Sequence, residues 1–315
     1  MPLTILPYLR GLLIAVEPAN CVSLARALKN VSHDRLSRIL KDKTFEWQTL
    51  LHAFVLRTFG KLQGGYLVID DTVINKSFAK TIENLAWIFC SKENRAVLGL
   101  NIVVLCWSNG IHTVPLAVKF WKKGGKSKYD LALELLAYAK NTLCLQPEYI
   151  AFDSWYASKK ILKRLRAYRW TFFSQLKRNR LFNKIPLPDV HHHPYWIEQG
   201  KIFEDMEVLV VRHGKKYFVT NNLSLSRQEV LAFYKTRWVI ETMFRILYSK
   251  LGLEDCQSIS LWAQTAHVYL SMMALILLAK RREETGKTEY EVRRECIFYP
   301  EKVENLLAAL RLEGA

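Results

Sequence analysis

The sequence lacks paired cysteines of the Cys-x-x-Cys type, although its 315 residues include six cysteines. Single cysteines scattered through mostly apolar runs argue against a zinc ribbon and against a disulfide framework. We therefore predict reduced, buried thiols and a cytoplasmic protein. The short apolar run at residues 12–16 has neither a charged leader nor a small-residue cleavage site, so it does not predict a signal peptide.

A complete P-loop and an uninterrupted membrane span are also missing. Residues 125–127 are Gly-Lys-Ser, but Phe120 stands where a P-loop requires its first glycine. We interpret this stretch as a flexible basic loop that contacts phosphates through Lys122, Lys123 and Lys126. Residues 262–279 are apolar, but polar side chains interrupt them, so we predict a buried core helix and no membrane partner.

Acidic residues are few: 29, against 46 lysines and arginines, which leaves a net charge of +17. Half of the residues are hydrophobic, so we expect a packed core rather than disorder. The excess of positive charge favours a polyanionic partner. Nucleic acid is favoured over an anionic membrane because aromatic residues are frequent and no long basic amphipathic helix stands alone. A basic protein without such a partner is the remaining alternative.

Proline and glycine are absent from residues 227–251, and Ser226 with Glu229 forms a capping-box pattern just before them. This predicts one long helix. At about 100° per residue its two faces differ, because one is apolar and the other polar. The polar face carries Arg237, Glu241, Arg245 and Tyr248, with Tyr234 beside them. Such a face is either a solvated ion-pair stripe or one wall of a site.

Residues 1–62 predict helices, and two of them, 23–28 and 32–42, have the size of a helix-turn-helix. Ser32 can cap the second helix. Its apolar side chains point inward and leave Arg35 and Arg38 exposed. This helix is either a recognition helix for the major groove of DNA or part of an ordinary helical hairpin.

An α/β core is predicted for residues 63–176. A buried strand, 66–69, ends in Asp70-Asp71, and another, 149–152, ends in Asp153. Between them, Asn109-Gly110 predicts a hairpin of two apolar strands. A basic helix at 158–167 and a strand at 170–176 follow. Ligand sites in α/β sheets gather at strand ends, so we expect one near these acids.

A β-rich insertion, residues 177–225, separates the two parts of the predicted core. It begins with Lys177 and Arg178, which are candidate DNA contacts, and it contains a hairpin of 206–212 and 215–220. Three adjacent histidines, 191–193, suggest a solvated loop more than a metal cluster, because neighbours cannot easily converge on one ion. The second part of the core, 226–283, carries the Glu241 helix, and 284–315 form a helical tail.

Three carboxylates therefore stand out: Asp70 or Asp71, Asp153 and Glu241. Converging carboxylates repel one another and need cations. Their hard oxygen atoms suit Mg²⁺ or Mn²⁺. Two such ions about 4 Å apart can activate a water or a 3′-hydroxyl and stabilise the leaving oxygen in phosphodiester transfer.

With its acids in the order Asp, Asp and Glu, this pattern resembles the RNase H-like core of DDE transposases, specifically the IS4-like group of bacterial insertion sequences. The motifs that carry the resemblance are IDDT at 69–72, AFDSWYAS at 151–158 and Y-x2-R-x3-E at 234–241. They span roughly residues 60–280. The resemblance implies a mixed α/β sheet with flanking helices, a β-rich insertion and an N-terminal helical domain.

The resemblance also implies roles for single residues. Asp153 and Glu241 would bind two Mg²⁺ or Mn²⁺ ions together with Asp70, or with Asp71 as the alternative. Tyr234 and Arg237 would contact transposon-end DNA. The implied activity is cut-and-paste transposition by a homodimer on double-stranded DNA, acting on terminal inverted repeats and target DNA in the bacterial nucleoid, with a hairpin intermediate. The alternatives are another RNase H-like nuclease or resolvase and a domesticated DNA-binding protein.

The motif of that family ends with a lysine seven positions after the glutamate, where this chain has Tyr248. The nearest lysine, Lys250, would point about 180° away from Glu241 if the helix continues. Tyr248 therefore either takes over the DNA contact or packs against a strand. If instead the helix ends early, Lys250 keeps the role.

Overall fold

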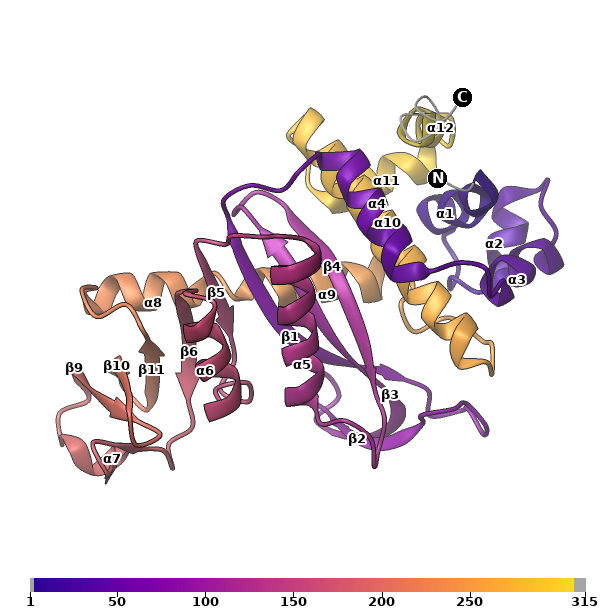
Figure 1. The fold of residues 1–315 in the computed structure, drawn as a ribbon. Coiled ribbons are helices and arrows are strands. Elements are labelled where there is room, and N and C mark those ends of the chain that lie inside the picture. The colour runs from indigo at the N-terminus through magenta and orange to yellow at the C-terminus, as the bar shows by residue number, and fades with distance from the viewer. Residues whose placement is uncertain (1–2, 309–315) are drawn as a thin grey trace.

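The computed structural model describes residues 3–308 and is built around a nine-stranded mixed sheet (Figure 1). Along the main path the order is β2-β3-β1-β5-β6-β11-β10-β9, and β4 also pairs with β3. The strands of this sheet are β1 (Tyr66–Asn75), β2 (Ala86–Cys90), β3 (Arg95–Ser108), β4 (Thr113–Trp121), β5 (Tyr149–Phe152), β6 (Phe172–Leu176), β9 (Tyr195–Ile202), β10 (Met206–His213) and β11 (Lys216–Thr220). The predicted mixed α/β class is confirmed.

Helices cover both faces of the sheet, with α5 and α6 on one and α8 and α9 on the other (Figure 1). The N-terminal helices pack with α10 and α11 at one end. The α-helices are α1 (Leu6–Ile14), α2 (Cys21–Leu28), α3 (His33–Lys41), α4 (Trp47–Phe59), α5 (Lys128–Ala137), α6 (Lys159–Ala167), α7 (Leu187–Val190), α8 (Arg227–Lys235), α9 (Trp238–Leu251), α10 (Leu261–Thr285), α11 (Glu289–Phe298) and α12 (Glu301–Ala308). The last seven residues of the predicted tail, 309–315, lie outside the described part.

Strand β1 does not end before the acids, as the sequence suggested, but runs through them to Asn75. The reason is its partner β3, which offers hydrogen bonds along the whole length of β1, from Tyr66↔Ser108 to Asn75↔Gly99. The parallel pairing with β5, in contrast, stops at Ile69↔Phe152. Asp70 therefore lies where β1 and β5 separate.

The single helix predicted after Ser226 is in fact two helices, α8 and α9. The capping box of Ser226 and Glu229 is present at the start of α8. At the break, the N–H groups of Thr236 and Arg237 bond to the carbonyls three residues earlier, at 3.2 and 3.1 Å, which tightens the turn. The Thr236 hydroxyl also donates to the Phe233 carbonyl at 2.6 Å. Tyr234 and Glu241 consequently belong to different helices.

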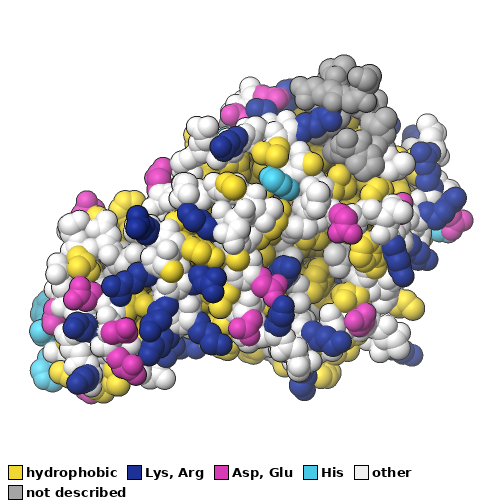
Figure 2. All heavy atoms as spheres, in the orientation of Figure 1, with side chains coloured by type: hydrophobic (Ala, Val, Ile, Leu, Met, Phe, Trp, Pro, Cys, Tyr) yellow, Lys and Arg dark blue, Asp and Glu magenta, His cyan; other side chains and the backbone are white. Residues whose placement is uncertain are grey.

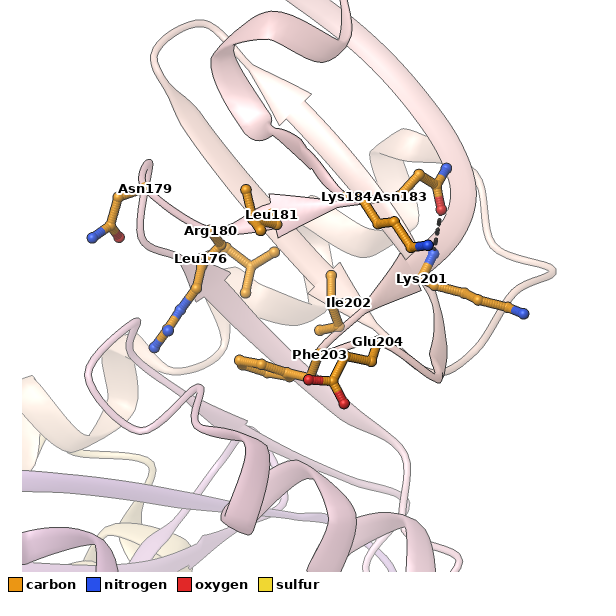
Figure 3. Close-up of a pocket in the computed structure, with 10 residues that line it drawn as sticks. All are labelled: Leu176, Asn179, Arg180, Leu181, Asn183, Lys184, Lys201, Ile202, Phe203 and Glu204. Carbon is orange, nitrogen blue, oxygen red and sulfur yellow. Dashed lines mark hydrogen bonds between the residues drawn. The ribbon is translucent and has the colours of Figure 1, made fainter.

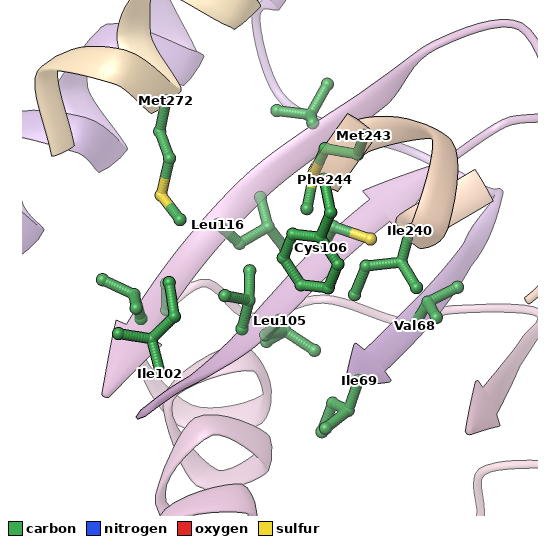
Figure 4. Packing of buried hydrophobic residues seen from close by; sticks show 14 of the residues in the cluster. Val68, Ile69, Ile102, Leu105, Cys106, Leu116, Ile240, Met243, Phe244 and Met272 are labelled. Atoms are coloured by element: carbon green, nitrogen blue, oxygen red, sulfur yellow. The ribbon is translucent and has the colours of Figure 1, made fainter. Parts of the chain in front are cut away.

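The apolar face of α9 fixes this helix on the sheet. Figure 4 shows Ile240, Met243 and Phe244 directed toward strands β1 and β3. Ile240 is fully buried and Met243 is 2% exposed. Each such side chain contributes about 1.5–3 kcal/mol through burial. This packing holds the polar face of α9 near Asp70 of β1.

Three strands of the insertion, β9, β10 and β11, extend the main sheet. The hairpin of the insertion, β10 and β11, lies within a residue of the predicted limits. Strand β11 pairs antiparallel with β6 of the core, and β9 adds an edge strand that the sequence did not predict. A small second sheet consists of β7 (Leu181–Phe182) and β8 (Ile185–Pro186). The domain boundaries themselves stay a prediction.

Helix α10 is the one described helix long and apolar enough to cross a membrane, and 83% of its most apolar window is buried. His267, in the N-terminal half of this helix, bonds to the Tyr8 hydroxyl at 2.8 Å and to the Gly252 carbonyl at 2.7 Å. These contacts are those of a core helix, as predicted. The six cysteines are free, but the prediction that all are buried is wrong, because Cys144 is exposed and Cys21 is partly exposed.

Candidate active site

Arg237 joins two of the predicted acids. Its Nη1 donates to Asp70 Oδ2 at 2.8 Å, and its Nη2 donates to Glu241 Oε1. The α8–α9 turn supplies Arg237, and the first turn of α9 supplies Glu241. The guanidinium is only 14% exposed, so these are partly buried ion pairs. A carboxylate from the sheet and one from a distant helix are thus held together by one cation.

Asp153 follows β5 directly and is the next residue in register with Asp70, beyond the last paired residues. Its Oδ1 accepts the backbone N–H groups of Trp155 at 2.9 Å and Tyr156 at 3.3 Å. These bonds fix the orientation of the carboxylate at the end of the strand.

Burial and the nearby Asp153 carboxylate raise the pKa of Asp70 to about 8, although Arg237 acts in the opposite direction. Burial also raises the pKa of Asp153. Both raised pKa values disfavour the ionised forms, because too little positive charge lies nearby to stabilise two negative carboxylates at once. Their chemistry therefore fits a hard divalent cation.

No three His, Cys, Asp or Glu side chains among residues 3–308 are grouped closely enough to hold a metal ion. The physical reason at this site is Arg237, because its guanidinium lies between Asp70 and Glu241. The three adjacent histidines do not converge either: all are exposed, and His191 pairs with Glu198 at 2.6 Å.

Asp71 points to the other side of β1, because successive side chains of a strand alternate between its faces. Its carboxylate accepts hydrogen bonds from Lys128 at 2.6 Å, Asn101 at 2.9 Å and the Tyr156 hydroxyl at 2.9 Å. Neither Arg237 nor Glu241 contacts it in the described structure. The geometry therefore groups Asp70, and not Asp71, with Glu241.

Tyr248 packs against strand β1, which is one of the two roles that the sequence left open. Its hydroxyl donates to the Val73 carbonyl at 2.9 Å and bonds to the Thr72 hydroxyl at 2.7 Å. Burial raises the pKa of this phenol well above its usual value. The expectation that Tyr248 presents its hydroxyl to DNA is therefore corrected, since its one proton is already donated within the protein.

Replacing Tyr248 by Phe is expected to lower the free energy of unfolding by about 1 kcal/mol, because the Val73 carbonyl and the Thr72 hydroxyl lose a partner. Affinity for DNA should stay the same. Chemical denaturation and a DNA-binding titration measure the two quantities. Weaker DNA binding with unchanged stability would show that the hydroxyl serves DNA after all.

Lys250 lies on the far side of α9 from Glu241. The helix continues to Leu251, so the possibility that it ends early is excluded. The Lys250 ammonium lies 5.3 Å from the ring centroid of Tyr290 on α11. Lys250 is exposed, so its predicted DNA contact stays a prediction, although the contact would lie away from Glu241. Arg245, in contrast, is exposed, as expected of a residue that could reach DNA.

Tyr234, in α8, is partly buried beside the site. Its ring packs on Phe218, with centroids 4.9 Å apart, and the guanidinium carbon of Arg237 lies 5.9 Å from the ring centroid. Tyr234 and Arg237, the two motif residues predicted to contact DNA, therefore remain neighbours although α8 ends between them.

The predicted basic contacts surround this region of the sheet. Lys122, Lys123 and Lys126 are exposed on the loop between β4 and α5, where Lys126 pairs with Glu134. Arg178 is exposed just after β6, and the Lys177 ammonium lies 4.4 Å from the Trp155 ring centroid. Figure 2 shows lysines and arginines gathered on the face that carries α5 and α6. Helix α6 exposes further basic residues that the sequence analysis did not assign to DNA: Lys160, Lys163, Arg164 and Arg166.

The N-terminal helix pair is present as α2 and α3. Ser32 caps α3 by accepting the N–H of Arg35 at 3.2 Å, and the apolar residues of α3 are buried. Arg35 and Arg38 are exposed. Because α3 packs on both α2 and α10, its exposed face is compatible with either predicted role.

A cavity of about 550 Å³ lies in the insertion (Figure 3). Apolar and basic side chains line it, among them Phe203, Arg180 and Lys184. None of the residues that the sequence predicted for the site lines it. It is therefore separate from the carboxylates.

Two observations define the class of protein: a mixed sheet whose adjacent strands bring two partly buried aspartates together, and a helix that carries a glutamate toward them. This is the arrangement that the resemblance to DDE transposases implied. Residues 61–277 match the family model described as "Transposase DDE domain". The chain therefore belongs to the DDE transposase family and is a DNA transposase, an enzyme that cleaves and joins DNA.

The fold is similar to that of the piggyBac transposase, solved by cryo-EM as a synaptic complex with hairpin DNA. The TM-score is 0.61 at 12% sequence identity, and the match covers 99% of this chain and 73% of that chain. No curated protein sequence matches this chain. The predicted DDE transposase family and mixed α/β fold are confirmed, whereas the IS4-like group stays a prediction.

Proposed function

We propose that the protein carries out cut-and-paste transposition of an IS4-like bacterial insertion sequence, by metal-dependent cleavage at the transposon ends and strand transfer into target DNA. The observation that carries this proposal is the convergence of Asp70 and Glu241 on Arg237, next to Asp153. Each acid comes from a separate segment of the chain, and the fold brings these segments to one place.

Asp70, Asp153 and Glu241 would hold Mg²⁺ or Mn²⁺, and two ions would activate the attacking water or 3′-hydroxyl and stabilise the leaving oxygen. In the described structure Arg237 bonds to Asp70 and Glu241 instead. A DNA phosphate is a strong bidentate acceptor for a guanidinium. Arg237 would turn to that phosphate and release both carboxylates, while the N–H groups of Trp155 and Tyr156 keep Asp153 in place.

The proposed partners are the terminal inverted repeats and the target DNA, bound by a homodimer in the bacterial cytoplasm, at the nucleoid. The net charge of +17 and the exposed basic side chains around the site support DNA as the partner. The synaptic complex with hairpin DNA of the piggyBac transposase supports a dimer that pairs two ends and a hairpin intermediate. The proposed DNA contacts are Tyr234, Arg237, Arg245, Lys122, Lys123, Lys126, Lys177, Arg178, Arg35 and Arg38.

The proposal is tested with a supercoiled plasmid that carries the DNA from both sides of the gene as transposon ends. With Mg²⁺, purified protein should excise the segment between the ends and join it to a target plasmid, and EDTA should prevent both steps. Cleavage that ignores the ends and gives no joined product would identify the alternative nuclease. Binding of the ends without any cleavage would identify a domesticated DNA-binding protein.

A further inference from the structure

Asp71 is the centre of a buried polar cluster that the reaction described above does not use. Three separate elements donate to its carboxylate: β3 through Asn101, the start of α5 through Lys128, and the loop after β5 through Tyr156. The side chains of Asp71 and Lys128 are 18% and 20% exposed, and Tyr156 is 1% exposed. Polar groups withdrawn from water in this way stabilise a fold only if they are well paired. The described bonds pair the Asp71 carboxylate with all three donors, while the amide oxygen of Asn101 is buried without a described partner.

Tyr156 connects this cluster to the active site. Its hydroxyl donates to Asp71 Oδ1 at 2.9 Å, and its backbone N–H donates to Asp153 Oδ1 at 3.3 Å. The same residue is therefore tied to β1 at its side chain and to Asp153 at its backbone. The loop gains a second anchor where Ser174 Oγ donates to the Asp153 carbonyl at 3.1 Å.

We propose that Asp71 and Tyr156 are positioning residues, which together fix the loop after β5 and so hold the Asp153 carboxylate in the orientation in which it binds metal. Lys128 and Asn101 hold Asp71 in the one orientation that receives the Tyr156 hydroxyl. The inference rests on the proposed function, because it assigns to Asp153 the metal-binding role given there. Groups that orient a metal ligand typically change metal affinity or activity by 10–100-fold when they are removed.

The decisive variant is Tyr156→Phe, which removes one hydroxyl and keeps both the buried ring and the backbone N–H. The Mg²⁺ concentration that gives half-maximal end cleavage should rise about tenfold. At saturating Mg²⁺ the rate should return to within about twofold of the wild-type rate, since the ligand itself is intact. Mn²⁺ binding to the complex with pre-cleaved end DNA, measured by electron paramagnetic resonance, should weaken by the same factor.

Asp71→Asn should give the same shift in metal dependence, because an amide that accepts from Lys128 cannot also accept from Tyr156. The double variant should be no worse than either single variant, as expected when both act through one contact. Two matched controls, Tyr168→Phe and Asp205→Asn, change exposed groups away from this cluster and should leave the Mg²⁺ titration unchanged.

Suppose that Asp153→Asn is inactive but that Tyr156→Phe and Asp71→Asn leave the Mg²⁺ midpoint unchanged. This result would overturn the positioning role and leave the proposed function intact. A fully active Asp153→Asn protein would overturn the proposed function itself. Loss of cleavage in Asp71→Asn at every Mg²⁺ concentration, with Asp70→Asn active, would make Asp71 a ligand and refute the positioning role. An additive effect of the two substitutions would also contradict it.

Discussion

Replacing Asp153 by Asn is expected to reduce transposon-end cleavage at least about 1,000-fold. The amide has the size of the carboxylate and keeps an oxygen to accept the Trp155 and Tyr156 N–H groups, but it carries no negative charge. A metal ion contributes several kcal/mol to charge stabilisation in such reactions, and each 1.4 kcal/mol corresponds to a factor of ten in rate. Cleavage of a labelled end duplex in Mg²⁺ measures the loss.

The same variant should bind end DNA within about threefold of wild type, because phosphate contacts from basic residues dominate such binding. Its thermal midpoint should not fall, since burial already disfavours the charged form of Asp153. Asp205→Asn, an exposed carboxylate of the insertion, is the matched control and should cleave normally. Cleavage by Asp153→Asn at the wild-type rate would remove Asp153 from the catalytic centre.

Replacing Asp70 by Asn is expected to stabilise the metal-free protein at pH 8 to 9 by a few kcal/mol. The folded-state pKa of Asp70 is about 8, whereas an aspartate in the unfolded chain has a pKa near 3.8. Between these values the folded protein holds a proton that the unfolded chain has lost, so the free energy of unfolding falls as the pH rises from about 4 to about 8. Each unit of pKa shift corresponds to about 1.4 kcal/mol, so the rise from 3.8 to about 8 gives an upper limit of about 6 kcal/mol.

An asparagine at position 70 cannot ionise, so this part of the pH dependence should disappear. Chemical denaturation at several pH values in EDTA measures it. Asp71→Asn is the control: its carboxylate is paired with Lys128, and its loss should destabilise the protein. Added Mg²⁺ should stabilise wild type more than Asp70→Asn. A destabilised Asp70→Asn protein at pH 8 would mean that Arg237 keeps Asp70 ionised in the folded state.

Much of the local structure was predictable, because its causes lie within a few residues. The capping box at Ser226 and the hairpin at Asn109-Gly110 depend only on short-range hydrogen bonds and turn geometry, and both are present. The apolar positions of α9 follow from the helical period, and most of them are buried as expected, although Val239 is partly exposed. The motifs at 151–158 and 234–241 also indicated Asp153 and Glu241 as site residues, because motif order and spacing can be read from the sequence without the fold.

The choice between Asp70 and Asp71 was made by the tertiary structure. Alternation along a strand places the two carboxylates on opposite faces, but only the packing of α9 against one face and of α5 against the other determines which acid meets Arg237 and which meets Lys128. The hydroxyl of Tyr248 is a similar case. Its position on the helix was predictable, but its partners Thr72 and Val73 belong to a strand about 175 residues away in sequence.

The length of β1 and the break between α8 and α9 were likewise decided by long-range contacts. Strand β1 continues past its acids because β3 pairs with it to Asn75, and the Tyr149 hydroxyl donates to Thr236 Oγ1 at 3.1 Å where the two helices meet. The sequence by itself determined which acids and which amphipathic elements the chain contains, because these depend on residue type and period. The tertiary structure alone decided which charges face one another, because that depends on how elements distant in the sequence pack.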